Sequence, residues 1–154
     1  MQTVTRGRYF ENFTVGERFM TQGRTVTETD IVAFAALTGD YDPLHVDAEF
    51  GKKTQFGERI AHGLLGASYA VGLITALGLT ERTVIAIVSM AWDFNGPIKI
   101  GDTIHVDQVV KSVRRTKKAD RGIVVFDLKL VNQRGEVVQK GERTLLVSRK
   151  PNVV

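Results

Sequence analysis

The chain has 154 residues, 43% hydrophobic and 25% charged, so we expect one globular domain over residues 1–154 rather than two domains or a disordered segment. It contains no cysteine, which excludes disulfides, thiolate catalysis and cysteine-based metal or iron–sulfur sites. The net charge of +4 comes without a nucleic-acid-binding motif and suits an anionic small ligand equally well, so we expect no nucleic-acid partner.

The first part of the chain predicts a lead-in, a strand and a helix. Residues 1–6 lack the apolar core of a signal peptide, so we expect a cytoplasmic protein. Residues 8–16 read as an ordered lead-in, and residues 17–26 carry enough Thr, Val and Phe for a first strand. Thr27 and Asp30 form the pattern of a capping box, which predicts a short helix that ends at Gly39. Its expected apolar side consists of Ile31, Phe34, Ala35 and Leu37.

A long connection, residues 39–62, follows this helix. Connections of this length are uncommon in compact domains unless they have a function. Pro43 excludes Asp42 from the helical region, and Gly39 and the nearby Asp side chains favour tight turns. Residues 38–47 are therefore expected to form neither regular helix nor strand. One helical turn is expected over residues 47–52.

Residues 63–79 predict a second helix that is apolar nearly all round and rich in Gly and Ala. The segment is slightly short for a membrane span and contains Ser68, Tyr69 and Thr75, so we expect no membrane insertion. A helix without a polar face in a soluble protein is expected to be buried on most sides.

The remaining sequence predicts strands. Residues 83–94 are rich in β-formers, residues 95–97 break them, and Ile104, Val106 and Val110 share one face that Gln108 interrupts. Apolar residues alternate from 124 to 130, and a turn at 132–135 precedes a last strand over 136–148. Long antiparallel strands after one apolar helix indicate an α+β fold, with a single antiparallel sheet wrapped around a central buried helix in the hotdog architecture.

The loop carries the candidate catalytic residues. Asp40 and His45 are five positions apart, and a carboxylate with a neutral imidazole can hold one water and move its protons, which suggests addition or removal of water. The alternative is a purely structural role, in which Asp40 closes a turn and His45 caps a loop. Gly63 begins the apolar helix, where its free N–H could polarise an acyl oxygen, or it serves packing alone. His62 is a candidate substrate-binding residue beside it, or a capping residue.

Two further ligand questions arise near the loop. A metal site from Asp40, His45 and His62 is conceivable, but the set has no recognised spacing, and we expect no metal. The basic residues that flank the loop could contact phosphate groups of a substrate or could form a solvated surface; they are Lys52, Lys53 and Arg59.

The loop residues resemble the signature of the MaoC-like dehydratase family, the (R)-specific enoyl-CoA hydratases. That signature is Gly-Asp-x-Asn-Pro-aliphatic-His-x-Asp, followed by Ala-His-Gly and the hotdog helix; here it occupies residues 39–47 and 61–63. Residues 8–16 and 96–102 are also similar to the family, so the resemblance covers nearly the whole chain. Asp42 stands where the strictest form has Asn, and this leaves substrate preference open.

The resemblance implies reversible hydration of a trans-2-enoyl-CoA to an (R)-3-hydroxyacyl-CoA. Asp40 would be the base that activates water, His45 would orient that water and help to deliver a proton to C2, and the Gly63 N–H would hold the thioester oxygen. No cofactor is expected beyond the coenzyme A of the substrate. The alternatives are a hotdog thioesterase and a non-catalytic acyl-thioester binding module. We expect a homodimer, in which two sheets join, or a higher homo-oligomer.

Overall fold

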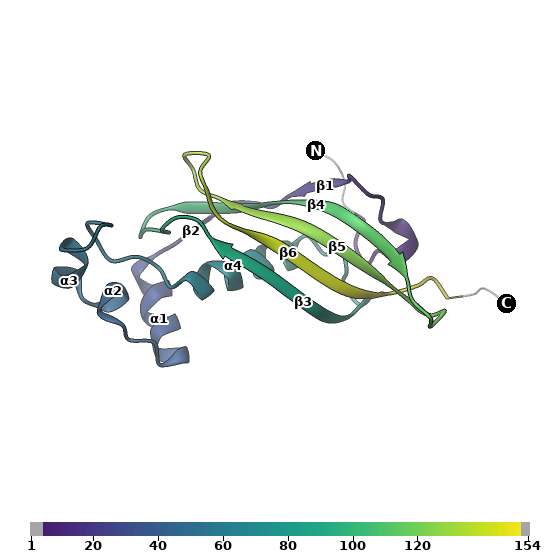
Figure 1. Ribbon diagram of the computed structural model, residues 1–154, viewed down its shortest axis with the longest axis horizontal. Helices are drawn as coiled ribbons and strands as arrows, with labels where there is room; N and C mark the ends of the chain where they lie inside the picture. The colour runs from purple at the N-terminus through teal and green to yellow at the C-terminus, as the bar shows by residue number, and fades with distance from the viewer. Residues whose placement is uncertain (1–4, 152–154) are drawn as a thin grey trace.

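One antiparallel sheet curls around a central helix in the computed structural model, which describes residues 5–151 (Figure 1). The elements in chain order are η1 (Phe10–Asn12), β1 (Arg18–Met20), β2 (Arg24–Thr25), α1 (Glu28–Thr38), α2 (Pro43–Val46), α3 (Ala48–Lys52), α4 (Gly63–Ala76), β3 (Val84–Phe94), β4 (Thr103–Arg115), β5 (Arg121–Val131) and β6 (Val137–Ser148). Helices α1, α2 and α3 gather beyond one end of the sheet.

The sheet has the order β1-β4-β5-β6-β3, and β2 pairs with β4 beside this path. Its inward face forms the core, because the alternating apolar residues of β4 and β5 are at most 1% exposed; they are Ile104, Val106, Val110, Val124, Phe126, Leu128 and Leu130. Leu65, Ala70 and Ile74 of α4 belong to the same core cluster. The expected hotdog arrangement and α+β class are therefore confirmed.

Three local expectations are wrong. The strand expected over residues 17–26 is broken into β1 and β2, because the Thr21 hydroxyl accepts a hydrogen bond from the Val106 N–H where a regular ladder would use a backbone carbonyl. Leu37 is 82% exposed rather than part of the apolar side of α1. Residues Pro43–Val46 form a helical turn, since Pro43 occupies the first helical position, where no N–H is needed.

Helix α4 is buried on one side rather than on most sides. Leu65, Ala70 and Ile74 face the core, whereas Leu64 is 65% exposed and Ser68 is also exposed. Among the described residues, the edge strand β3 pairs only with β6, and its apolar side chains other than Trp92 are exposed. Within residues 5–151 no helix is long and apolar enough to cross a membrane.

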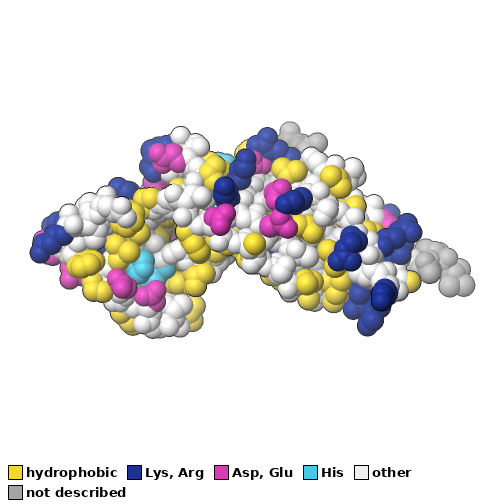
Figure 2. Space-filling view, in the orientation of Figure 1, with side chains coloured by type: hydrophobic (Ala, Val, Ile, Leu, Met, Phe, Trp, Pro, Cys, Tyr) yellow, Lys and Arg dark blue, Asp and Glu magenta, His cyan; other side chains and the backbone are white. Residues whose placement is uncertain are grey.

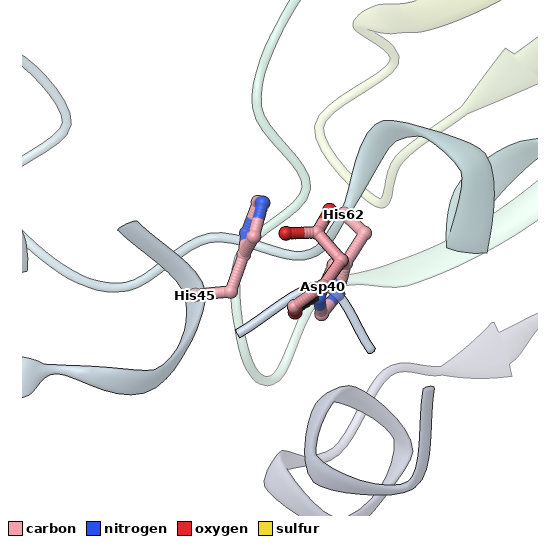
Figure 3. Close-up of side chains that lie close together, drawn as sticks. All are labelled: Asp40, His45 and His62. Carbon is pink, nitrogen blue, oxygen red and sulfur yellow. Dashed lines mark hydrogen bonds between the residues drawn. The ribbon is translucent and has the colours of Figure 1, made fainter. Parts of the chain in front are cut away.

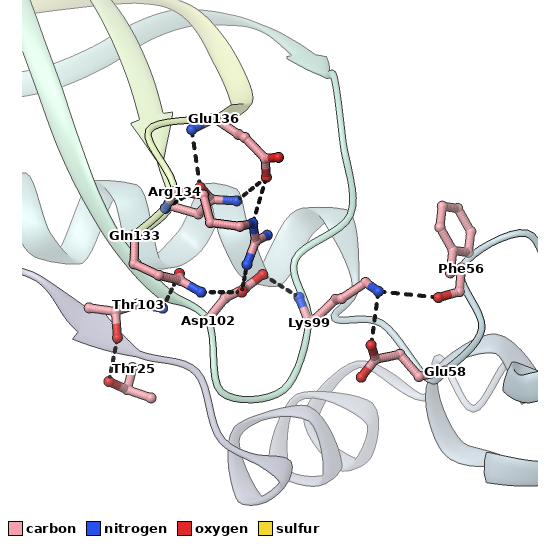
Figure 4. Close-up of polar contacts among 10 residues, drawn as sticks. Thr25, Phe56, Glu58, Lys99, Asp102, Thr103, Gln133, Arg134 and Glu136 are labelled. Carbon is pink, nitrogen blue, oxygen red and sulfur yellow. Dashed lines mark hydrogen bonds and ion pairs between the residues drawn. The ribbon is translucent and has the colours of Figure 1, made fainter.

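The loop between β3 and β4 fastens the long connection to the sheet (Figure 4). The Lys99 ammonium donates to the Phe56 carbonyl at 3.3 Å and pairs with Glu58 at 2.9 Å. The buried Asp102 carboxylate accepts from the Lys99 N–H at 2.9 Å and pairs with Arg134 at 2.9 Å. These contacts fix the segment that precedes α4 and thereby position the residues described next.

Candidate active site

The C-terminal end of helix α1 positions Asp40. The predicted capping box is present: the Thr27 hydroxyl accepts from the Asp30 N–H at 3.3 Å, and the Asp30 carboxylate accepts from the Thr27 N–H at 2.8 Å. The helix ends where Gly39 adopts a φ of 79°, a conformation that favours glycine. This turn places the exposed Asp40 directly after the helix, and its carboxylate accepts the Asp42 N–H at 3.3 Å.

The second turn fixes the direction of His45. Asp42 has an extended ψ of 133° before Pro43, as expected, and its carboxylate caps α2 through the Leu44 N–H at 2.9 Å. His45 Nδ1 lies 2.8 Å from the Ile60 carbonyl oxygen. Because a carbonyl can only accept, Nδ1 carries the hydrogen, and in the neutral form of the ring Nε2 is the nitrogen with a free lone pair.

His62 holds these two residues together. Its Nε2–H donates to the Asp40 carbonyl at 2.9 Å, and its ring stacks on the His45 ring with centroids 3.9 Å apart. The ring is 2% exposed and also packs against Phe34, with centroids 5.0 Å apart. The structure therefore places His62 where it supports Asp40 and His45 from behind.

Asp40, His45 and His62 form one cluster (Figure 3). One ligand atom from each lies within 4.8 Å of the others, and no direct hydrogen bond joins the side chains. Separations of this size allow a single water to bridge a carboxylate and an imidazole, since each of its hydrogen bonds spans about 2.8 Å. The rings of His45 and His62 are only 26° from parallel. Their in-plane lone pairs therefore do not converge on one ion about 2 Å away.

The N-terminus of α4 completes the site. The Gly63 N–H, at the first helical position, has no acceptor among residues 5–151, and the helix dipole adds partial positive charge there. A Cβ on Gly63 would lie 2.8 Å from the Phe94 ring, so packing also requires this glycine. A cavity of about 280 Å³, lined by Asp40 and His62, and one of about 490 Å³, lined by His45, meet at Gly63 and Phe94.

At the surface this region is apolar and acidic. Figure 2 shows histidine atoms visible at the surface of the left-hand lobe, with acidic side chains beside them and hydrophobic ones around them. A nonpolar surround with a few placed polar groups is typical of a small-molecule site.

Sequence analysis missed Gln139, a residue of β6 that is 2% exposed and lines the larger cavity. Its Oε1 accepts the Trp92 Nε1–H at 2.9 Å, and its Nε2 donates to the Gly63 carbonyl at 2.9 Å. Because the Trp92 ring nitrogen can only donate, this partner fixes which end of the amide faces Gly63. Because β6 contains five other polar or charged residues, the polarity of Gln139 alone did not single it out; they are Lys140, Glu142, Arg143, Thr144 and Ser148.

The three basic candidates are not gathered at the cluster. Lys52 pairs with Glu49 at 2.5 Å and is mostly exposed, and Arg59 pairs with Glu28 at 2.7 Å. Lys53 follows α3 and is exposed. None of the three lines the two cavities at Gly63.

Known proteins resemble this chain over most of its length. Residues 10–130 match the MaoC like domain family. A protein of Klebsiella aerogenes named Protein MaoC is 42% identical over 115 residues, which cover 74% of this chain but only 33% of that protein. An (R)-specific enoyl-CoA hydratase of Rhodospirillum rubrum is 34% identical over 140 residues, 90% of this chain and 91% of that protein.

A solved structure agrees in fold. A protein from Archaeoglobus, described as a monoamine oxidase regulatory protein, is 39% identical with a TM-score of 0.89, covering 96% of this chain and 99% of its own. The family match spans the cluster, the start of α4 and most of the sheet. The chain therefore belongs to the MaoC-like dehydratase family.

Proposed function

We propose that this protein reversibly adds water to a trans-2-enoyl-CoA to form an (R)-3-hydroxyacyl-CoA. One observation carries the proposal: a ring nitrogen of His45 and a carboxylate oxygen of Asp40 lie within 4.8 Å of each other, and the Gly63 N–H that borders the same cavities has no acceptor among residues 5–151. These are the groups that a water addition needs, two acceptors for water and one donor for the developing oxyanion. The names of similar hydratases support the same reaction class.

The hydrogen bonds support a division of roles between the two acceptors. His45 donates through Nδ1 to the Ile60 carbonyl, which leaves Nε2 to accept one water hydrogen and orient the molecule. The Asp40 carboxylate takes the other hydrogen as a proton while the water oxygen bonds to C3. Asp40 then returns that proton to C2 on the same face, and the hydrogen held by His45 stays in the new hydroxyl.

The thioester oxygen gains negative charge when C3 is attacked. The Gly63 N–H donates to that oxygen, and the positive end of α4 stabilises it without any reorganisation. Phe94 covers Gly63 and helps to exclude bulk water from this contact, although the ring itself is 54% exposed.

Turnover of crotonyl-CoA tests the proposal. Asp40→Asn and His45→Ala should each lower the hydration rate by about 10²–10⁴-fold, the range that positioned acid–base groups contribute. Asp47→Asn is the matched control: this loop residue caps α3 through the Glu49 and Phe50 N–H groups, a role that Asn retains, so its rate should match wild type.

Two assays identify the reaction in the same samples, namely loss of enoyl absorbance and release of free thiol. Thiol release without hydration would identify a thioesterase, and ligand-induced stabilisation without turnover would identify a binding module. Wild-type hydration rates in both Asp40→Asn and His45→Ala would also refute the proposed catalytic roles.

We propose in addition that the protein is a homodimer joined along β3. The outer edge of this 11-residue strand is unpaired within the described chain, and apolar residues along it are exposed, among them Ile85, Ile87 and Val88. A long apolar edge strand favours pairing with another strand, and a second copy supplies an identical edge.

A further inference from the structure

A separate cavity of about 370 Å³ lies at the other end of α4. Its apolar wall residues are Val71 of α4, Val84 and Ile87 of β3, and Leu145 of β6, and Thr75 and Thr80 line it beside them. Arg143 of β6 also lines it. The cavity thus combines nonpolar walls with one buried cation, the pattern of a pocket that takes an apolar group with a charged end.

Arg143 has no partner for its charge. The residue is 5% exposed, yet it makes no hydrogen bond or ion pair with any part of residues 5–151, and its buried Nε is unsatisfied. Its nearest compensation is the Phe126 ring, 5.7 Å from the guanidinium carbon. Burial lowers the pKa of Arg143 to about 10, so the group is still protonated at neutral pH. Buried charges in proteins are normally paired, and this one therefore needs an anion.

The rest of the cavity adds positive charge. Arg6 and Glu81 line it and neutralise each other at 2.6 Å. Arg82 also lines it and forms no ion pair with the described residues. Two cations, Arg143 inside and Arg82 at the exposed rim, are therefore left without a carboxylate.

The cavity and the proposed active site share the same two elements. Val71 lies eight residues after Gly63 on α4, a distance of about 12 Å at the helical rise. On β6, Gln139 and Arg143 are four residues apart and so point to the same face, about 13 Å apart along the strand. This cavity shares no lining residue with the two at Gly63, so an acyl chain that starts at Gly63 would have to run along α4 for about 12 Å to reach Arg143.

We propose that this cavity binds a carboxylate at the far end of the substrate's acyl chain, so that the enzyme prefers enoyl thioesters of dicarboxylic acids. A guanidinium binds a carboxylate through two parallel hydrogen bonds, whereas the apolar walls suit methylene groups. The inference rests on the proposed hydration reaction for its substrate, but the binding step can be measured without turnover.

Binding is measured with saturated acyl-CoA probes of matched length that can span this distance: suberoyl-, sebacoyl- and dodecanedioyl-CoA against octanoyl-, decanoyl- and dodecanoyl-CoA. Wild type should bind at least one carboxylated probe about 10–100-fold more tightly than its uncharged match, the factor expected of a hydrogen bond to a charged group. Arg143→Met should lose that preference and bind the uncharged probes as wild type does. Arg143→Lys should keep part of it.

Thermal unfolding without ligand gives an independent readout. Since the guanidinium has no partner, Arg143→Met should unfold at the same or a higher temperature than wild type. A lower melting temperature, or loss of the dimer, would show that Arg143 has a structural partner and would overturn the proposal. If Arg143→Met weakened the binding of free coenzyme A by the same factor, the arginine would contact the phosphates of coenzyme A, and the proposal would also be overturned.

Kinetics separate this inference from the proposed function. If wild type hydrates crotonyl-CoA but shows no preference for a terminal carboxylate at any length, the inference fails and the hydratase proposal stands. If carboxylated probes bind through Arg143 but no enoyl-CoA is hydrated, the cavity assignment stands and the reaction is wrong.

Discussion

Two buried glutamines allow a direct test of what holds the start of α4. Gln139 on β6 and Gln108 on β4 are both at most 2% exposed. Gln139 bonds Trp92 through its oxygen and the Gly63 carbonyl through its nitrogen, whereas neither polar atom of Gln108 has a partner. Substitution by Met keeps nearly the same length at both positions and removes the amide, so the pair separates hydrogen bonding from burial.

The expected magnitudes follow from these bonds. In Gln139→Met the Trp92 N–H loses its acceptor, and the Gly63 carbonyl keeps only its bond within the helix. Loss of partners of this kind costs about 1–3 kcal/mol, and we expect a free energy of unfolding lower by that amount. Gln108→Met removes two polar atoms that have no partner, so it should be neutral or slightly stabilising.

Urea unfolding and steady-state kinetics measure the two effects. Because Gln139 orients the residue that carries the oxyanion donor, Gln139→Met should lower kcat for crotonyl-CoA about tenfold or more and leave KM nearly unchanged. The single tryptophan, Trp92, should also change its emission. Gln108→Met should keep wild-type kcat and emission. Equal destabilisation by both substitutions, or wild-type kcat in Gln139→Met, would refute the reasoning.

Two further predictions concern pH and assembly. Burial tends to raise the pKa of Asp102, but hydrogen bonds from Lys99, Arg134 and Gln133 outweigh it and hold that pKa below its usual value. This stabilisation is complete above the unfolded-state pKa of about 4 and is lost as pH falls through the folded-state value. Asp102→Asn should therefore lower the urea midpoint most at pH 7 and progressively less below pH 4; an equal loss at every pH would contradict this. Val88→Lys should convert the proposed dimer to a monomer in light scattering, and a monomeric wild type would contradict the dimer.

Local sequence signals predicted the elements that depend on local chemistry. The capping box at Thr27, the helix end at Gly39 and the extended Asp42 before Pro43 each depend on neighbouring residues only, and all three are confirmed. The alternating residues of β5 also predicted their own burial, because the two faces of a strand differ in solvent exposure.

Features that depend on distant segments escaped prediction. The break between β1 and β2 arises from a side-chain bond between Thr21 and Val106, 85 positions away. The hydrogen bond from Gln139 to Gly63 joins residues 76 positions apart, and the sequence around neither residue predicts it. The apolar sequence of α4 predicted burial on most sides of the helix, yet Leu64 is exposed to solvent. The catalytic roles of Asp40 and His45 are still predictions.

Three hydrogen bonds of the site have the same form: a side-chain N–H donates to a backbone carbonyl. His45 donates to a loop carbonyl, His62 to the Asp40 carbonyl and Gln139 to the Gly63 carbonyl, so side-chain N–H groups are used to fix the backbone. The atoms left over are the Asp40 carboxylate, Nε2 of His45 and the Gly63 N–H. Two acceptors and one donor are the set that a water and an enolate oxygen require. Substitution of His62 or Gln139 should therefore disturb catalysis, even though neither residue contacts the reacting atoms in the proposed reaction.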